Sequence, residues 1–241
     1  MTTIESEALI LRSYEYKEKD AIVTVLLEDK TLDLLARGVQ SIQSKNRSII
    51  QPFSYVNNTY QEKSNCFPIL MFGEVKKFYY HINEDLEKQM ICLILNDCVR
   101  FLPKSKEIFS LFNDCWNAFH NNSNDALAYA CILLKEAITN QGITPYLEGC
   151  VSCGRKNRIE TFSLKEGGFL CSSCNAHRYK KWNKEDLICI LSLFRSNLSQ
   201  IEKLVSLYDF NIDYFVFLLD WLEYHLDYKF SSYEFLKTLI K

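Results

Sequence analysis

Two short cysteine pairs constrain the fold of this chain more than any other feature of its sequence. Cys150 and Cys153 are separated by two residues, as are Cys171 and Cys174, and 17 residues lie between the pairs. Two residues between cysteines let one tight turn direct both sulfur atoms at a single ion, and two such turns complete a tetrahedral set of thiolates. The spacing therefore predicts one structural zinc ion bound by these four cysteines.

Two other interpretations of the four cysteines remain open: a redox pair and simple buried thiols. A redox centre needs one pair rather than two matched pairs, which favours zinc. With four protein ligands the ion has no open position for water or substrate, so we expect it to organise the fold and not to catalyse a reaction. His177 is close by, but a lone histidine beside a complete ligand set is more often a surface residue, and we leave it out of the site.

The residues around the pairs predict their local geometry. Gly154 and Asn175 take the same place after each pair, and both tolerate the positive φ that such a turn tends to need. The two glycines at 167–168 predict a turn between the pairs. Phe162 and Phe169 flank that turn, so we expect a short hairpin there.

The other six cysteines form no pattern. Isolated cysteines in strand-like or helix-like segments usually behave as small buried hydrophobic residues, and we expect this for all six. They are Cys66, Cys92, Cys98, Cys115, Cys131 and Cys189.

The first eighty residues have the pattern of β structure. Apolar and β-branched runs separated by turn-type residues predict five short strands. They cover residues 7–14, 21–27, 32–39, 53–60 and 69–78, and one of the turns falls at Ser64 and Asn65. Five strands in a segment of this size fit an OB-type barrel, although an SH3-like barrel has a similar pattern.

From residue 83 the apolar period becomes helical. Asn83 is a candidate cap for a first helix that ends before Pro103, and further helices are expected over 106–119 and 125–140. Asn183 is a candidate cap for a helix reaching residue 194, followed by helices over 212–226 and from Ser231.

The expected fold class is α+β and multi-domain. We predict a five-stranded OB-fold barrel over 1–80, an α-helical domain over 81–149 and 176–241, and an inserted four-cysteine zinc module over 150–175. With 48% hydrophobic residues, the chain can fill such cores.

The charge of the chain is unevenly distributed. The formal net charge is −2, so bulk electrostatics alone would not hold nucleic acid. Residues 150–184, however, contain eight basic side chains and only two acidic ones, Glu160 and Glu166. This segment is therefore the strongest electrostatic candidate for a polyanion, although four thiolates and a zinc ion would offset part of its charge.

Several classes of protein are disfavoured by what the sequence lacks. The longest apolar stretch, residues 126–134, is shorter than the roughly 18 residues of a membrane span, and the N-terminal residues do not resemble a secretory signal. We therefore expect a cytoplasmic protein without a membrane partner.

The motifs HExxH, GxxxxGK[ST], GxGxxG and GxSxG are absent from the sequence. We therefore expect that the chain is not an enzyme.

Several segments of the chain resemble the RecO family of bacterial recombination mediators. In the barrel region they are EALILRSYEYKEKDAIVTVLLEDK, LLARGV, QPFSYVNNTYQ and FGEVKKFY, and further on ITPYLEGCVSCGRKNRIETFSLKEGGFLCSSC is similar to the cysteine module of that family. The resemblance covers nearly the whole chain. Its barrel motifs are weak and its cysteine motif is strong.

The resemblance implies a fold and a role. In that family an OB domain is followed by a helical domain interrupted by a cysteine module. The implied role is to bind single- and double-stranded DNA, to anneal complementary strands, and to help load RecA onto strands coated by single-strand-binding protein. RecR and the C-terminal tail of single-strand-binding protein are the implied partners, and the implied location is the bacterial cytoplasm at the nucleoid.

Candidate DNA contacts are basic side chains that could follow a phosphate backbone and aromatic rings on which bases could stack. The basic candidates are Arg12, Arg37, Lys45, Arg47, Lys76 and Lys77 in the barrel and Arg155, Lys156 and Arg158 in the module. The aromatic candidates are Tyr14, Tyr16, Phe53 and Tyr60. The alternatives stay open, since a single lysine is more often a solvated surface charge and an aromatic residue in a short strand more often fills a core. One departure from the family matters, since residues 39–42 read Val-Gln-Ser-Ile where relatives are typically basic.

A second hypothesis is that the chain is a protein-interaction scaffold, in which barrel and module bind only protein partners.

Residues 212–226 are apolar on more than one face. We expect there either a groove for the acidic, hydrophobic tail of single-strand-binding protein or plain core packing.

Overall fold

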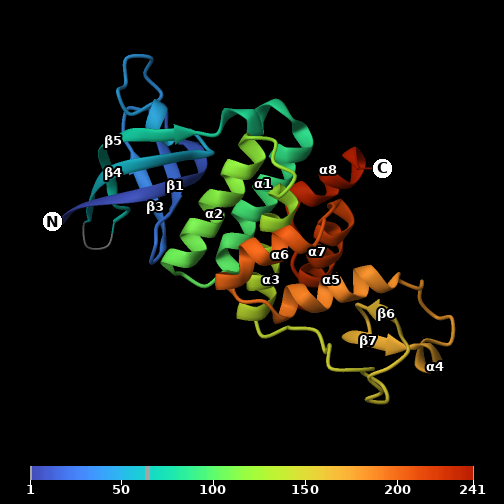
Figure 1. Cartoon of the computed structure of the whole chain (residues 1–241). Coiled ribbons are helices and arrows are strands. Elements are labelled where there is room, and N and C mark those ends of the chain that lie inside the picture. Colours follow the sequence, from blue (N-terminus) through green and yellow to red (C-terminus); the bar gives the residue numbers. More distant parts are fainter. Residues whose placement is uncertain (1, 63–65, 241) are drawn as a thin grey trace. The chain divides into compact units, whose positions relative to one another are not determined.

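The computed structural model describes residues 2–62 and 66–240. The chain forms two compact units, shown in Figure 1. Unit one contains the N-terminal residues as far as Leu133 together with the C-terminal segment from Phe230, and unit two contains Leu134–Lys229. The division at residues 80, 149 and 175 expected from sequence stays a prediction.

A closed five-stranded barrel begins unit one. Its strands are β1 (Thr2–Tyr16), β2 (Asp20–Leu26), β3 (Thr31–Ala36), β4 (Ser54–Glu62) and β5 (Ile69–Phe78). They pair in the order β1-β2-β3-β5-β4, antiparallel except for β3 with β5, and β4 closes onto β1. This confirms the OB-type fold. The turn expected at Ser64 and Asn65 lies outside the described residues.

The barrel core follows the alternation of the strands. Inward side chains such as Ile10, Val23 and Leu34 are buried in one cluster that Tyr60 joins at 1% exposure. Phe53 is also buried, with its ring 5.4 Å from that of Trp116. Of the two interpretations of Phe53 and Tyr60, base stacking and core packing, the structure supports core packing, because both rings fill the interior.

Helices complete unit one. They are the α-helices α1 (Leu86–Cys98), α2 (Lys106–His120), the first half of α3 (Ala126–Asn140) and α8 (Ser231–Leu239), with 3-10 turns η1 (Ser48–Ile50), η2 (Tyr80–Glu84) and η3 (Val99–Phe101). Asp85, not Asn83, caps α1 by accepting from the Lys88 N–H at 3.1 Å. Asn83 lies two residues before the cap, inside η2, and accepts instead from the side chain of Gln89.

Polar side chains of α1 fasten it to the barrel. The buried Asn96 amide donates to the backbone oxygen of Leu11 at 2.9 Å. Its neighbour Asp97, also buried, forms an ion pair with Arg12. One strand of the barrel is thereby tied to one helix through adjacent residues.

Five of the six unpatterned cysteines are buried, as expected, and one is not. Burial raises the pKa of the Cys92, Cys98, Cys115 and Cys189 thiols, so they behave as inert apolar groups. Cys66 is exposed, and its expected burial is wrong. It lies between β4 and β5, outside the strands whose side chains form the barrel core.

Unit two is built from the second half of α3, the hairpin strands β6 (Ile159–Ser163) and β7 (Gly168–Cys171), and the helices α4 (Ser172–Asn175), α5 (Lys184–Arg195), α6 (Ile201–Leu207) and α7 (Ile212–Leu226), with the 3-10 turn η4 (Leu198–Gln200). Asn183 caps α5 as predicted. Helix α6 was not expected from the sequence, because its seven residues are too few to show a clear apolar period. In the described part of the chain, the helices all fall short of the length and apolarity that crossing a membrane requires.

Candidate metal centre and nucleic-acid interface

The four patterned cysteines lie together in unit two. Their sulfur atoms are all within 4.8 Å of one another, and the sulfur atoms of Cys153 and Cys171 are 3.8 Å apart. A tetrahedral ion with metal–sulfur bonds of about 2.3 Å places its ligands about 3.8 Å apart. The donor set and its spacing therefore fit one zinc-sized, thiolate-binding ion.

Two different turns present the cysteine pairs. In the first, the Gly154 N–H donates to the Cys150 carbonyl at 2.8 Å, and Gly154 has φ +71° as expected. In the second, α4 follows Cys171, and positive φ occurs at Ala176 and His177. The expectation of a positive φ at Asn175 is wrong.

Asn175 has a different role in the second turn. Its buried side chain accepts from the Tyr179 N–H at 3.0 Å and donates to the Tyr179 carbonyl at 3.1 Å. It therefore holds the chain that leaves the turn, a role that requires its amide and not a left-handed backbone.

The electrostatics of the cluster favour a bound cation. Burial opposes ionisation of Cys150, but backbone N–H groups outweigh it and lower the pKa of its thiol to about 6. The neighbouring sulfurs of Cys153, Cys150 and Cys171 raise the pKa of Cys174 to about 12. Thiolates this close repel one another, so all four ionise together only when a metal ion compensates their charge.

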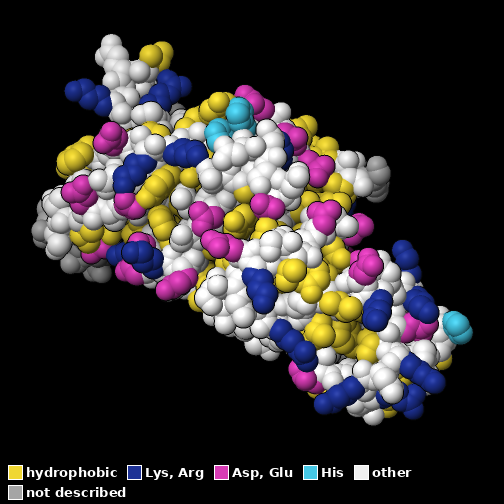
Figure 2. All heavy atoms as spheres, in the orientation of Figure 1, with side chains coloured by type: hydrophobic (Ala, Val, Ile, Leu, Met, Phe, Trp, Pro, Cys, Tyr) yellow, Lys and Arg dark blue, Asp and Glu magenta, His cyan; other side chains and the backbone are white. Residues whose placement is uncertain are grey.

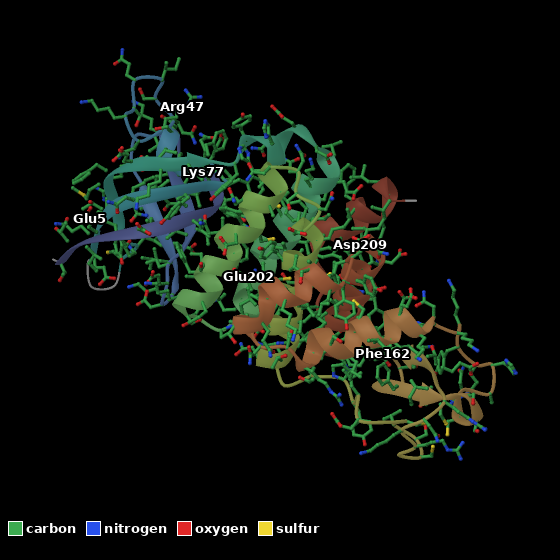
Figure 3. All side chains as sticks on the ribbon, in the orientation of Figure 1. Glu5, Arg47, Lys77, Phe162, Glu202 and Asp209 are labelled. Atoms are coloured by element: carbon green, nitrogen blue, oxygen red, sulfur yellow. The ribbon has the colours of Figure 1, made fainter. Side chains whose placement is uncertain are left out.

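Aromatic packing attaches the β6–β7 hairpin to α7. The Phe162 ring, labelled in Figure 3, lies 5.6 Å from Phe169, 4.7 Å from Phe217 and 5.3 Å from Trp221. This confirms the hairpin and shows that its inner face is part of the core of unit two.

A close backbone contact requires glycine at the start of β7. The Tyr146 N–H donates to the Gly167 carbonyl and the Phe169 N–H donates to the Tyr146 carbonyl, so the chain before the first cysteine pair runs beside β7. A Cβ atom at Gly168 would overlap the Tyr146 carbonyl oxygen, whereas one at Gly167 would meet open space.

Gly168→Ala is therefore expected to lower the free energy of unfolding by more than about 2 kcal/mol, because backbone must move to admit the methyl group. Gly167→Ala is the matched control and should cost about 1 kcal/mol, since only its positive φ (+82°) is strained. Chemical denaturation of the two variants measures the difference. Equal losses would show that the close approach to Tyr146 does not matter.

The basic side chains of the module divide into paired and unpaired groups. Glu166 binds Arg178 at 2.8 Å and Glu160 binds Lys181 at 3.4 Å. Within the described residues, six others lack an ion pair and are exposed: Arg155, Lys156, Arg158, Lys165, Lys180 and Lys184. Figure 2 shows the Lys and Arg side chains spread over the part of the surface that Figure 1 assigns to β6, β7 and α4. The module thus presents a surface with excess positive charge.

The structure separates the basic candidates of the barrel in the same way. Arg12 is paired with Asp97, Lys76 with Glu7, and Lys77 contacts the Asn117 side chain. All three side chains thus already have polar partners within unit one. Arg37, Lys45 and Arg47 are exposed and have no ion pair among the described residues, which leaves them as the stronger candidates.

One group of candidates was missed in the sequence. Lys17 and Lys19 lie in the turn between β1 and β2, both exposed, and the Lys17 ammonium lies 5.1 Å from the ring centre of Tyr16. Tyr14 and Tyr16 themselves are 51% and 38% exposed. OB barrels bind oligonucleotides on the β2–β3 face and its flanking loops, so the predicted fold itself could have pointed to this turn.

Comparison with known proteins agrees with the fold and the cysteine cluster. The family "Recombination protein O N terminal" matches residues 1–75 and "Recombination protein O C terminal" matches residues 84–234. A DNA repair protein RecO from Syntrophomonas wolfei is 27% identical over 208 residues, covering 83% of this chain and 82% of the relative. A DNA repair protein RecO from Caldanaerobacter subterraneus is 24% identical over 246 residues, covering 99% of both. One from Shouchella clausii is 30% identical over 175 residues, covering 70% of this chain and 68% of the relative. The chain therefore belongs to the RecO family.

Proposed function

We propose that this chain is a DNA-binding recombination mediator in DNA repair, which anneals complementary strands and, with RecR, helps load RecA onto strands coated by single-strand-binding protein. Membership of the RecO family, whose relatives are named DNA repair proteins, supports a role in repair and accords with the expectation that the chain is not an enzyme. The main observation in support of DNA binding is that, within the described residues, the module and the barrel each have exposed cations without an ion pair.

We propose zinc as the ion of the cysteine cluster. Cys150, Cys153, Cys171 and Cys174 would supply all four ligands, so the ion would fix the two turns and the hairpin between them. Arg155, Lys156 and Arg158 lie directly after the first pair and are exposed, and the Cys150 N–H donates to the Arg155 carbonyl at 2.8 Å. The ion would thus act on DNA only through the residues it positions.

We propose that phosphate contacts come jointly from module and barrel. In the barrel the contacts would come mainly from Arg37, Lys45 and Arg47, with Arg12, Lys76 and Lys77 contributing only if their present partners release them. Such contacts carry no sequence information, which suits a protein that anneals any complementary pair.

The partners are proposed from family membership. RecR and the acidic tail of single-strand-binding protein remain the proposed protein partners, and chromosomal DNA in the cytoplasm the proposed location. An open groove formed by residues 212–226 finds little support, because Phe215, Leu219 and Leu222 of α7 are fully buried. These side chains fill the core of unit two, and a tail peptide would have to bind elsewhere.

The competing function is a scaffold that binds only proteins. Measuring DNA affinity against salt concentration separates the two, since phosphate contacts release counterions and make log K fall steeply with log[salt]. A mediator should bind oligonucleotides of any sequence with a clear slope. A scaffold would show little binding at any salt concentration.

Reversing two charges on the barrel loop should weaken DNA binding to a smaller extent than changes in the module. Lys45→Glu with Arg47→Glu removes two exposed cations from a loop that carries few others, so the salt slope should fall by about two or less. Both side chains lie on the surface, so the variant should fold and keep its metal. An unchanged slope would remove this loop from the DNA site.

A further inference from the structure

The segment between β3 and β4, residues 37–53, extends beyond the strands of the barrel in Figure 1. We infer that Ile42, near the middle of this β3–β4 loop, inserts as an apolar wedge between stacked base pairs of duplex DNA. The inference rests on the proposed DNA-binding function and adds to it a residue that opens the duplex locally.

Hydrogen bonds on both sides of Ile42 hold this part of the loop in place. The Gly38 N–H donates to the Asp20 carboxylate at 2.9 Å, and the Asn46 side chain donates to the Met71 carbonyl at 2.9 Å. Within the loop, the Ser44 N–H donates to the Ser41 carbonyl at 3.0 Å. A side chain near the middle of the loop is thus presented from an anchored support.

Ile42 differs in exposure from the other aliphatic and aromatic side chains of the loop. Val39, Ile49, Ile50 and Phe53 are all at most 5% exposed, packed into unit one. Ile42 is 88% exposed. The loop therefore directs these other apolar residues inward and leaves one branched side chain in water, which an apolar partner would bury.

The charge of the loop identifies the partner as a polyanion. No acidic residue occurs between Asp33 and Glu62, and the exposed cations Arg37, Lys45 and Arg47 flank Ile42 on both sides in the sequence. Figure 3 labels Arg47 at this end of the barrel. Proteins that kink duplex DNA combine cations on the backbone with an apolar wedge between base steps, and isoleucine is one of the residues used.

The test uses short duplexes in which 2-aminopurine, whose fluorescence rises when it leaves the base stack, replaces adenine at successive positions. The full chain should raise the fluorescence. Ile42→Ser should lose most of that rise, while Ile42→Leu, which keeps an apolar wedge, should retain it. Leu207→Ser, which changes a 62% exposed side chain of unit two, is the matched control and should behave like the parent.

Affinity separates this inference from the function on which it rests. Ile42→Ser should bind duplex DNA within about threefold of the parent, because the cost of unstacking offsets the gain from burial. If the parent and Ile42→Ser both bind the duplex and give equal fluorescence, the proposed insertion of Ile42 is overturned and the proposed DNA binding is not. A rise confined to single-stranded probes, or dimers of the chain lost in Ile42→Ser, would also overturn it. Failure of the parent to bind DNA at low salt would overturn both.

Discussion

Replacing Cys171 with serine is expected to remove the bound metal and to unfold the segment around both cysteine pairs. The Cys171 sulfur lies 3.8 Å from that of Cys153, within the cluster of four, so three thiolates would remain and could not complete the tetrahedron. In small zinc modules the free energy of metal binding, on the order of 10 kcal/mol, is largely folding free energy. Elemental analysis should find one zinc per parent chain and none per variant.

The exposed Cys66 provides the matched control. Cys66→Ser changes a cysteine outside the cluster and should keep one zinc per chain. Loss of the fold in Cys171→Ser should be confined to unit two, with hydrogen exchange of the barrel strands unchanged. A parent chain without stoichiometric metal, or a Cys171→Ser variant that retains it, would refute the metal assignment.

Reversing three charges of the module, with Arg155→Glu, Lys156→Glu and Arg158→Glu, is expected to weaken DNA binding by about tenfold or more at roughly 0.1 M salt. The three side chains are exposed, and Arg155 donates to the Ser173 hydroxyl rather than to a carboxylate. Each lost phosphate contact should lower the salt slope by about one. Base preference should not change, because phosphate contacts do not read sequence.

An equal change of charge elsewhere tests whether position matters. Lys106→Glu, Lys203→Glu and Lys237→Glu together alter the net charge by the same amount and should have a much smaller effect on DNA binding, although they also remove the ion pairs of Lys106 with Glu28 and of Lys237 with Glu234. Zinc content and chemical denaturation of both triple variants should match those of the parent, which separates lost contacts from lost structure in both units. If the module variant binds and anneals DNA like the parent, the module is not part of the DNA surface, and the barrel is its main site.

The parts of the fold that could be predicted depend on local patterns. The alternation of apolar residues predicts the five barrel strands, and the cysteine spacing predicts the cluster, because two-residue turns bring sulfur atoms together whatever surrounds them. Asn183 is predicted as a cap because its side chain precedes a clear helical period, and it caps α5. In each case the signal lies within one continuous segment of the chain, of at most 25 residues for the four cysteines.

The parts that could not be predicted depend on distant partners. Phe53 and Tyr60 are aromatic residues of the kind that can stack on bases. Only the folded barrel shows that both are buried, with the Phe53 ring packed against Trp116. In the sequence, Arg12 and Lys76 cannot be distinguished from unpaired cations. The fold places Asp97 beside Arg12 and Glu7 beside Lys76, and each pair forms a salt bridge. A single sequence contains these residues but not the pairing between them.

The central claim, that this chain mediates the pairing of DNA strands, is tested most directly by the rate at which complementary strands coated with single-strand-binding protein anneal, with and without this chain. We predict faster annealing in its presence, with the gain reduced in the triple variant of the module and retained in the triple control. Annealing at the same rate with and without the chain, while the chain holds its zinc and is folded, would contradict the claim and favour the protein-interaction scaffold.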